Sequence, residues 1–381
     1  MMTPPLSGIR ILDLTRLLPG GVCTMLLAEM GAEVIKIEDP NGGDYARWMP
    51  PLVNGVGAFF QATNRGKRSV ILNLKDARGQ AVLKKLAEAA DVLIEGNRPG
   101  VMARLNCDYK QLRAVNPRLI YCSLSGWGQD GPYAQKSGHD LNYIATAGIL
   151  GAMRQPQPLG GQMADVGGAL VAVGAILAAL FRRERSGEGA YIDASLFESG
   201  LLFALEPWVE ALTMHAGGSP SGLTGGLACY NTYMTRDGRP VALAALEPKF
   251  WANFCHAVGR PDLITDYQSP ARQKYLLAEV AGIFALRTAD EWDRLLRDVD
   301  CCYTAIKTVD ALADHPQVQA RGAAGLDENG LPWMRSPIRL DGQSLGTAPG
   351  YGEHTRAVLR EAGYSAAEID ALCAEGVAQG D

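Results

Sequence analysis

The sequence has few of the residues that build metal and redox centres. Its 381 residues include 8 cysteines and 5 histidines, which form neither a Cys-x-x-Cys pair nor a His-Glu-x-x-His motif. Most of the cysteines lie among apolar residues, where a free thiol behaves as a small hydrophobic group. We therefore expect a reduced, cytoplasmic protein that has no metal site.

Excess positive charge and long apolar runs are also missing. The formal net charge is −5 and the isoelectric point is about 5.7, whereas a nucleic-acid-binding protein shows a basic face. The N-terminus, MMTPPLSGIR, lacks the apolar core of a signal peptide. The longest apolar run, Gly167–Phe181, is shorter than the roughly 20 residues of a membrane span. We expect a buried helix there, and neither a nucleic acid nor a membrane as partner.

Two kinds of hydrophobic period alternate over the first two hundred residues. Short apolar runs predict strands and segments of helical period lie between them, which indicates a parallel sheet covered on both faces. After about residue 225 the pattern changes to a hairpin around Asp237-Gly238 followed by helices, typical of a smaller α+β domain. The predicted strands of the first part are Ile9–Leu14, Glu33–Glu38, Ser69–Leu74, Asp91–Glu95 and Arg118–Leu124, and its clearest helices are Gly20–Met30, Asp76–Ala90 and Tyr109–Val115.

One imidazole and two carboxylates stand among small or apolar neighbours. His139 lies in SGHDLNY, Asp165 in MADVGG and Glu247 in LEPKF. A histidine paired with carboxylates suits acid/base chemistry on a carbon acid. The sequence has no Walker loop and no Gly-x-Ser-x-Gly motif, so neither a nucleotide triphosphatase nor a serine hydrolase is indicated.

Each of these residues also has a purely structural interpretation. Asp165 precedes a long apolar helix, where it either presents a carboxylate at the positive helix end or serves as a plain N-cap. His139 is either a catalytic group or a histidine at a helix start. Asp140 either orients His139, caps the helix that begins at Leu141, or acts as an auxiliary acid. Glu247 either orients His139 or caps the helix that begins at Pro248.

An anionic ligand of this acidic protein needs a local group of cations. Lys75 follows the third predicted strand, and Arg98 and Arg104 follow the fourth. Loops after parallel strands are where such sheets bind ligands. These three residues are therefore candidate anion-binding groups, although a solvated basic face would give the same pattern.

Several stretches together make the chain resemble the family III CoA-transferase (CaiB/BaiF-like) superfamily from end to end. The matching stretches are PLSGIRILDL, LLAEMGAEVIKIEDP with GGD after it, RGKRSVILNLK, DVLIEGNRPGVMARL, NPRLIYCSLSGWGQDGPY, SGHDLNYIA, ADVGGAL, HPQVQARG and APGYGEHT. The resemblance implies an α/β fold in an interlocked homodimer. It assigns residues 1–200 and 326–381 to a large Rossmann-like CoA-binding domain with a parallel sheet, 201–227 to a linker and 228–325 to a small α+β domain.

The superfamily contains two chemistries, and the motifs favour one of them. Gly138-His139-Asp140 resembles the α-methylacyl-CoA racemase branch, whereas transferases typically carry an aromatic residue at the position of His139. Glu247 in LEPKF and Tyr230 in CYNTY also match the racemase pattern, the latter as a substrate-pocket hydroxyl or simply as a hairpin aromatic. Asp165 matches both branches. The resemblance implies an acyl-CoA substrate and no separate cofactor, because CoA is part of the thioester.

The alternative function is transfer of CoA between carboxylic acids, with Asp165 as a nucleophile that forms an acyl-enzyme anhydride. A non-catalytic acyl-CoA-binding relative would not need His139, Asp165 and Glu247 together. One departure from the family pattern concerns the nucleotide, since Asp39 stands where an arginine is common after EVIKIE. Arg47 is the candidate that would compensate for it. The segment between His139 and Asp165 is also shorter than in typical racemases.

Overall fold

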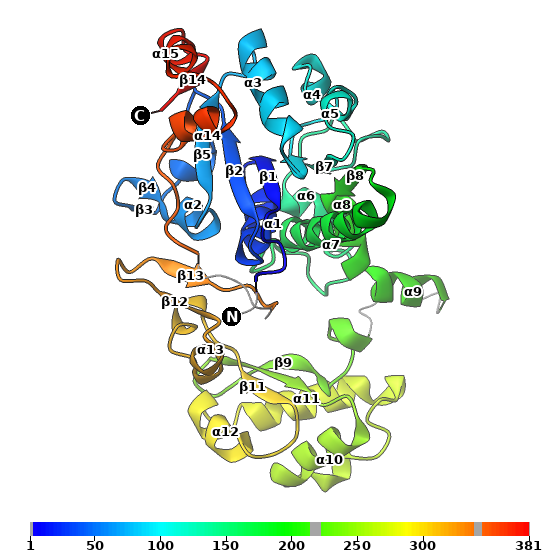
Figure 1. Cartoon of the computed structure of the whole chain (residues 1–381). Coiled ribbons are helices and arrows are strands. Elements are labelled where there is room, and N and C mark those ends of the chain that lie inside the picture. Colours follow the sequence, from blue (N-terminus) through cyan, green and yellow to red (C-terminus); the bar gives the residue numbers. More distant parts are fainter. Residues whose placement is uncertain (1–2, 214–221, 339–344, 381) are drawn as a thin grey trace. The chain divides into compact units, whose positions relative to one another are not determined.

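The apolar strands of the first part of the chain build a mainly parallel sheet in the computed structural model, which describes residues 3–213, 222–338 and 345–380 (Figure 1). Within these residues, seven strands pair in the order β14-β5-β2-β1-β6-β7-β8, and β14 alone is antiparallel to its neighbour. The six parallel strands have the order of a doubly wound Rossmann fold. The bounds are β1 (Arg10–Leu14), β2 (Glu33–Glu38), β5 (Arg68–Leu72), β6 (Val92–Glu95), β7 (Ile120–Ser125), β8 (Ala190–Ser195) and β14 (Ala378–Gln379).

Helices follow these strands and cover the sheet. Helix α7 (Met163–Ser186) packs against α1 (Leu17–Glu29), β7 and β8. It is the one helix among the described residues that is long and apolar enough to cross a membrane, but its buried side forms part of the domain core. The buried helix predicted at 167–181 lies within it. The other helices here are α2 (Ala58–Thr63), α3 (Ala77–Glu88), α4 (Val101–Arg104), α5 (Tyr109–Val115), α6 (Asp140–Thr146), α8 (Leu196–Phe203), α13 (Pro316–Arg321), α14 (Thr355–Glu361) and α15 (Ala366–Ala374).

The chain divides into two compact units. The larger is made of residues 1–147, 159–202 and 315–381, and the smaller of residues 148–158 and 203–314. Residues 148–158, which the sequence pattern groups with the large domain, thus belong to the smaller unit, where the Arg154 side chain lies beside Gly225. Part of the predicted linker, 214–221, lies outside the described residues.

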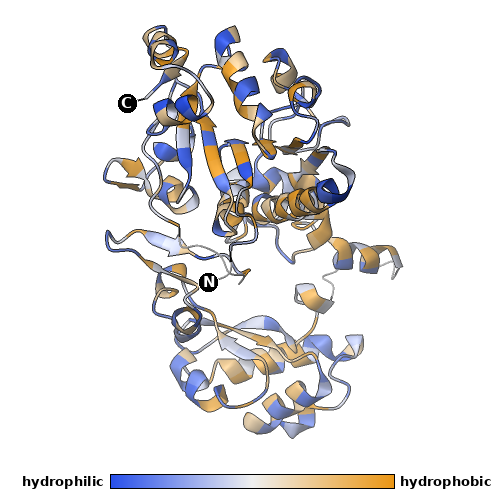
Figure 2. Cartoon of the chain, viewed as in Figure 1, coloured by the Kyte–Doolittle hydropathy of each residue, from blue (hydrophilic) through white to orange (hydrophobic). Residues whose placement is uncertain are grey.

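Both ends of the larger unit contribute to one hydrophobic core. Leu12, Ile35 and Leu93 from central strands are fully or nearly fully buried, and Leu359 and Ile369 from α14 and α15 join the same cluster. The strands are mostly apolar in Figure 2, with hydrophilic positions among them, and apolar residues predominate as expected for a sheet covered on both faces. The C-terminal segment is therefore an integral part of the domain that the N-terminus begins.

The smaller unit forms around the predicted hairpin. Strand β9 (Tyr230–Met234) pairs antiparallel with β10 (Pro240–Ala244), which pairs with β11 (Tyr303–Ala305). Gly238 in the turn has a φ of 73°, which favours glycine. Trp251, Phe284 and Trp292 fill its core. Its helices are α9 (Leu205–Thr213), α10 (Pro248–Ala257), α11 (Gln273–Phe284) and α12 (Ala289–Leu296).

Short elements complete the described chain. Two two-stranded sheets lie in the larger unit, and single turns of 3-10 helix lie in both. The strands are β3 (Leu52–Val53), β4 (Val56–Gly57), β12 (Ala324–Leu326) and β13 (Pro332–Met334), and the turns are η1 (Tyr45–Arg47), η2 (Gly222–Thr224), η3 (Pro261–Leu263), η4 (Pro270–Arg272) and η5 (Val309–Ala311).

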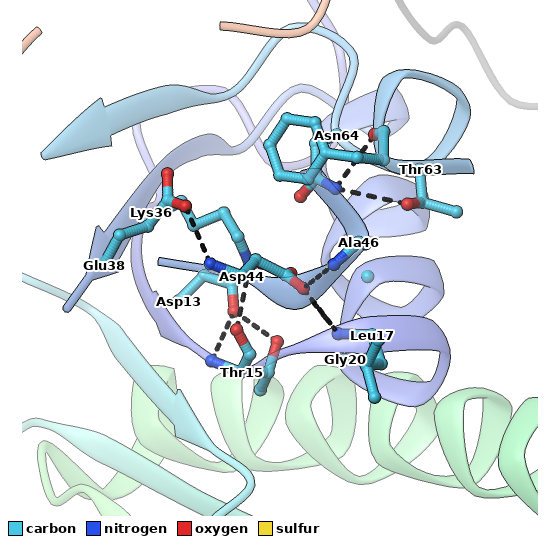
Figure 3. Close-up of polar contacts among 12 residues, drawn as sticks. Asp13, Thr15, Leu17, Gly20, Lys36, Glu38, Asp44, Ala46, Thr63 and Asn64 are labelled. Carbon is cyan, nitrogen blue, oxygen red and sulfur yellow. Dashed lines mark hydrogen bonds and ion pairs between the residues drawn. The ribbon is translucent and has the colours of Figure 1, made fainter. Parts of the chain in front are cut away.

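A buried ionic cluster connects β1, β2 and the loop after β2 (Figure 3). The Lys36 ammonium lies 3.0 Å from the Asp44 carboxylate and 3.9 Å from that of Asp13, and it donates to the Thr15 carbonyl at 2.9 Å. Lys67 contacts Asp13 at 3.3 Å from the other side. The Asp44 carboxylate also accepts hydrogen bonds from the backbone N–H groups of Leu17 and Ala46. One buried carboxylate thus joins the starts of α1 and η1.

The charges in this cluster are maintained by their neighbours. Burial raises the pKa of Asp13, but Lys36, Lys67 and the Thr15 donors outweigh it and hold that pKa at about 2. Burial likewise opposes the charge on Lys36, yet Asp13 and Asp44 raise its pKa above the usual value. For Lys67 burial prevails, and its pKa falls to about 8.

Replacing Lys36 with methionine is expected to destabilise the larger unit by about 3–5 kcal/mol, because Asp13 and Asp44 stay buried with too little positive charge. The matched control is Lys85→Met, which removes an exposed ion pair with Glu88 and is expected to change stability little. Urea unfolding followed by circular dichroism measures both. Equal stability losses in the two variants would contradict the importance of the buried cluster.

Candidate active site

A cavity of about 520 Å³ opens at the carboxyl ends of β6 and β7, beside the segment that leads into α6. His139, which the sequence analysis singled out, is part of its wall. The cavity combines polar, cationic and aromatic groups, which is the composition of ligand pockets. Its lining consists of Gly96, Asn97, Arg98, Pro99, Ser125, Gly126, Trp127, Ala134, Lys136, Ser137, Gly138, His139, Asn142 and Tyr143.

His139 is the N-cap residue of α6 and is exposed. Its backbone N–H donates to the Asn142 side-chain oxygen at 3.0 Å, and its carbonyl accepts from the Asn142 N–H at 2.8 Å. This reciprocal pair fixes the backbone at the helix start. The backbone that carries the imidazole is thereby held in place at the cavity wall.

Asp140 joins α6 to α7. It is the first residue of α6, but its buried carboxylate accepts hydrogen bonds from the backbone N–H groups of Ala164 at 2.7 Å and Asp165 at 3.1 Å. These donors lie in the first turn of α7, where helix N–H groups have no partner within the helix. Of the interpretations considered from the sequence, capping is the one supported, although the capped helix is α7 and not α6.

Asp165 lies in the first turn of α7 and is half-buried, while Gln162 is the N-cap. Burial, and then the nearby negative charge of Asp140, raise the pKa of Asp165 to about 6. Its carboxyl therefore changes protonation state close to neutral pH. Since Asp140 follows His139 and contacts the Asp165 backbone, the structure brings these three predicted residues together from two separate segments.

Tyr143 lines the same cavity as His139. Its hydroxyl donates to the Gly138 carbonyl at 2.8 Å, and its ring packs edge-on against Trp127 with centroids 4.9 Å apart. Burial, then the charge of Asp165, raise its pKa to about 12, so the hydroxyl keeps its proton. The sequence analysis did not single out Tyr143, since its only signal is its place four residues after His139.

Glycines in the loop after β7 permit this close packing. A Cβ on Gly126 would lie 2.2 Å from the Tyr143 hydroxyl oxygen, and Gly128 has a φ of 89°. Gly126, Gly128 and Gly131 have the Gly-x-Gly-x-x-Gly spacing of a dinucleotide fingerprint. That fingerprint requires a helix directly after the glycines, but here turns and extended chain lead to α6 at Asp140. Gly126 thus serves packing against Tyr143, whereas Gly128 and Gly131 have the positive φ that favours glycine.

The predicted cations occupy different places. Arg98 lines the large cavity, whereas Lys75 lines a second cavity of about 200 Å³ with Leu14 and Asn97, at the point where the strand order reverses between β1 and β6. Ligands bind at such switch points. Arg104 is exposed at the end of α4 and lines neither cavity.

Two cations in these cavities were not singled out from the sequence. Lys136 lines the large cavity with its ammonium 3.8 Å from the centre of the Tyr133 ring. Arg16 lines the second cavity and donates to the Tyr45 hydroxyl at 2.6 Å. Arg16 follows the first strand directly, and that position was the available signal for it.

Arg47 does not reach toward a nucleotide. Its guanidinium is buried and donates from Nε and Nη2 to Glu38 at 2.8 and 2.7 Å, and from Nη1 to the Pro349 carbonyl at 3.0 Å. It also lies 3.9 Å from the centre of the Phe60 ring. These contacts hold the guanidinium inside the fold. The prediction that Arg47 binds the nucleotide in place of the arginine missing at Asp39 is therefore wrong.

Glu247 and Tyr230 belong to the smaller unit. Glu247 is exposed at the N-cap position of α10, before Pro248, and its side chain makes no capping hydrogen bond. Tyr230 begins β9 and is half-buried. Their predicted roles as an orienting acid and a pocket hydroxyl stay predictions.

Comparison with known proteins shows to which family this chain belongs. The family model described as CoA-transferase family III matches residues 6–355. The chain belongs to this family. It is therefore an enzyme that acts on acyl-CoA, with the mainly parallel sheet of the family. A solved CaiB/BaiF family protein from Brucella suis is 31% identical, with a TM-score of 0.81 over 95% of this chain and all of that one.

The similar curated relatives include both chemistries of the family. Mouse alpha-methylacyl-CoA racemase is 34% identical, covering 99% of this chain and 98% of its own. Succinate–glutarate CoA-transferase of Agrobacterium fabrum is 35% identical, covering 94% of this chain and 96% of its own. Because these identities are nearly equal, the reaction has to be argued from the residues of the site.

Proposed function

We propose that this family member interconverts (R)- and (S)-2-methylacyl-CoA thioesters by 1,1-proton transfer through an enolate. The observation that supports this most directly is that Asp140, the residue after His139, caps the helix start that carries Asp165, whose pKa is raised to about 6. An imidazole is a common proton-transfer group in enzymes, and a carboxyl with a raised pKa, such as that of Asp165, is suited to exchange a proton with carbon.

The reaction requires two proton-transfer groups on opposite sides of the α-carbon. One group removes the α-proton, and the other returns a proton to the opposite face. For one enantiomer His139 is the base and Asp165 the acid, and for the other enantiomer the roles are reversed. Such proton transfer contributes roughly 10²–10⁴-fold to the rate, and stabilisation of the enolate oxygen by backbone N–H groups supplies a further part.

The phosphates of CoA need cations at the carboxyl edge of the sheet. Lys75 and Arg16 line the cavity at the switch point, and Arg98 and Lys136 line the cavity of His139. We assign the CoA moiety to these two cavities, with Arg104 as an exposed cation nearby in sequence. The proton transfer is redox-neutral, so the thioester itself is the only group that the chemistry requires.

The second candidate is CoA transfer between carboxylic acids, which the similar identity to succinate–glutarate CoA-transferase favours. In that reaction the Asp165 carboxylate attacks the thioester carbonyl, CoA leaves as the thiolate, and an aspartyl anhydride forms. The CoA thiolate then attacks the aspartyl carbonyl, which releases the first acid and leaves an aspartyl-CoA thioester. A second carboxylate attacks this thioester to give a new anhydride and the thiolate, and the thiolate finally takes the new acyl group and restores the Asp165 carboxylate. The presence of His139 rather than an aromatic residue argues for the racemase, because transfer through an anhydride needs no base at that position.

Incubation with (R)- or (S)-2-methylacyl-CoA in D2O, without a second acid, is expected to give deuterium at C2 with inversion. His139→Ala and Asp165→Ala should each lower the rate of inversion by at least about 100-fold while CoA still binds. His256→Ala, an exposed histidine of α10, is the matched control. CoA transfer upon addition of a free acid, with no exchange at C2, would instead identify Asp165 as a nucleophile.

The pH dependence should follow Asp165. For the enantiomer that needs Asp165 as base, kcat/KM should fall as the pH drops below about 6, because the carboxyl is then protonated. Asp140→Asn keeps an oxygen for the α7 N–H groups but removes a negative charge, so the pKa of Asp165 should fall. The acid limb should then move to lower pH with the fold retained. An unshifted limb in this variant would contradict the assignment.

We also propose that the chain forms the interlocked homodimer expected from its family, for which helix α9 gives support. It has no buried residue, and its apolar side chains Leu205, Trp208, Val209 and Leu212 are 48–63% exposed. Contiguous exposed apolar surface of this kind marks a contact with another protein surface.

Replacing Leu205, Trp208 and Leu212 together with glutamate is therefore expected to convert a dimer into a monomer, because each charge would be buried at the contact. Light scattering after size-exclusion chromatography measures the mass. The control Leu286→Glu changes an equally exposed leucine elsewhere in the smaller unit and should stay dimeric. A monomeric wild-type protein, or a dimeric triple variant, would refute the proposal.

A further inference from the structure

Two hydrogen-bond donors in the wall of the His139 cavity lack acceptors. Ser125, the last residue of β7, is only 6% exposed, and its hydroxyl has no hydrogen-bond partner among the described residues. The indole N–H of Trp127 is also buried and without a partner there. Both residues line the cavity. Leaving a buried donor unpaired costs about 1–3 kcal/mol, so these two groups point to a ligand that supplies acceptors.

Packing holds the Trp127 ring in place. The ring meets Tyr133 and Tyr143 edge-on, with centroid distances of 5.1 and 4.9 Å, and lies 5.6 Å from Phe197. Its nitrogen is 3.3 Å from the position that a Cβ on Gly138 would occupy. The donor is therefore fixed next to the residue that precedes His139, where a bound thioester has to pass.

The character of the donors indicates which part of the ligand they meet. A serine hydroxyl and an indole N–H are neutral and suit neutral carbonyl oxygens, whereas Arg98 and Lys136 of the same cavity suit phosphates. If His139 is at the α-carbon, the chain between α-carbon and phosphates is the pantetheine arm. That arm contains two amide carbonyls as its neutral acceptors.

We propose that Ser125 and Trp127 bind the amide carbonyl oxygens of the pantetheine arm of the CoA thioester. This inference rests on the proposed placement of CoA in the His139 cavity, and it applies equally to a racemase and to a transferase. The cavity volume of about 520 Å³ is within the usual range for small-molecule sites. The two residues thus act as binding residues that place the thioester before His139.

Ser125→Ala and Trp127→Phe test the proposal, since the phenyl ring of the latter keeps most of the aromatic packing. Calorimetry should show roughly three- to tenfold weaker binding of both CoA and free pantetheine for each variant. Ser186→Ala and Trp333→Phe are matched controls in the same unit and should bind like the wild type. Binding is measured without turnover, so this result is independent of which reaction the enzyme catalyses.

A third ligand identifies the carbonyl involved. An S-propyl 2-methylacyl thioester has the thioester carbonyl but no amide, so it should react equally with wild type and variants. A loss of reactivity with this compound would place the donors on the thioester or acyl oxygen and overturn the proposal, as would unchanged affinity for CoA and pantetheine. If Ser125→Ala fails to fold, Trp127→Phe decides the question alone.

Discussion

The ion pair between Lys36 and Asp44 constrains the ligand-binding edge of the sheet. Lys36 is on the second strand, and Asp44 belongs to the following loop but also holds the N–H groups of Leu17 and Ala46. Asp13 on the first strand is bound to the same ammonium. Buried charges are costly unless every partner is in place, so the cluster permits one arrangement of strand ends and loop. The cavity at the switch point is built upon that arrangement.

A second polar interaction, the capping of α7 by Asp140, lies further along the ligand-binding edge of the sheet and affects the chemistry of the site. The Asp140 carboxylate fixes the start of α7, and in doing so sets where Asp165 stands relative to His139. The same charge raises the pKa of Asp165. One side chain thus determines both position and protonation, which neither a serine nor a threonine cap would do, since these are neutral. This explains why the cap, Asp140, is an acid close to a second acid, Asp165, although repulsion between two carboxylates lowers stability.

Local patterns in the sequence were sufficient for much of the fold. Glu33–Glu38 and Tyr109–Val115 have the bounds predicted from their periods, and Asp76, where a helix was predicted to begin, is the N-cap of α3. Contacts between distant segments were not accessible in this way. The capping of α7 by Asp140 joins residues 24 and 25 positions apart, and the burial of Arg47 depends on Glu38 and on the carbonyl of Pro349. No local period records either contact, so an exposed and a buried arginine look alike in sequence.

The two chemistries of the family make opposite demands on the same carboxyl. A nucleophile for anhydride formation gains from staying ionised, and hence from a low pKa, which a neighbouring cation would provide. A group that alternates between acid and base gains from a pKa near the working pH. Here the neighbour of Asp165 is an anion, and burial acts in the same direction. Sequence identity is an average over the whole chain, so near-equal identity to racemases and transferases does not distinguish the two reactions. The charge of Asp140, by contrast, acts directly on Asp165, the proposed reacting group. Together with an imidazole at position 139, it favours proton transfer over acyl transfer.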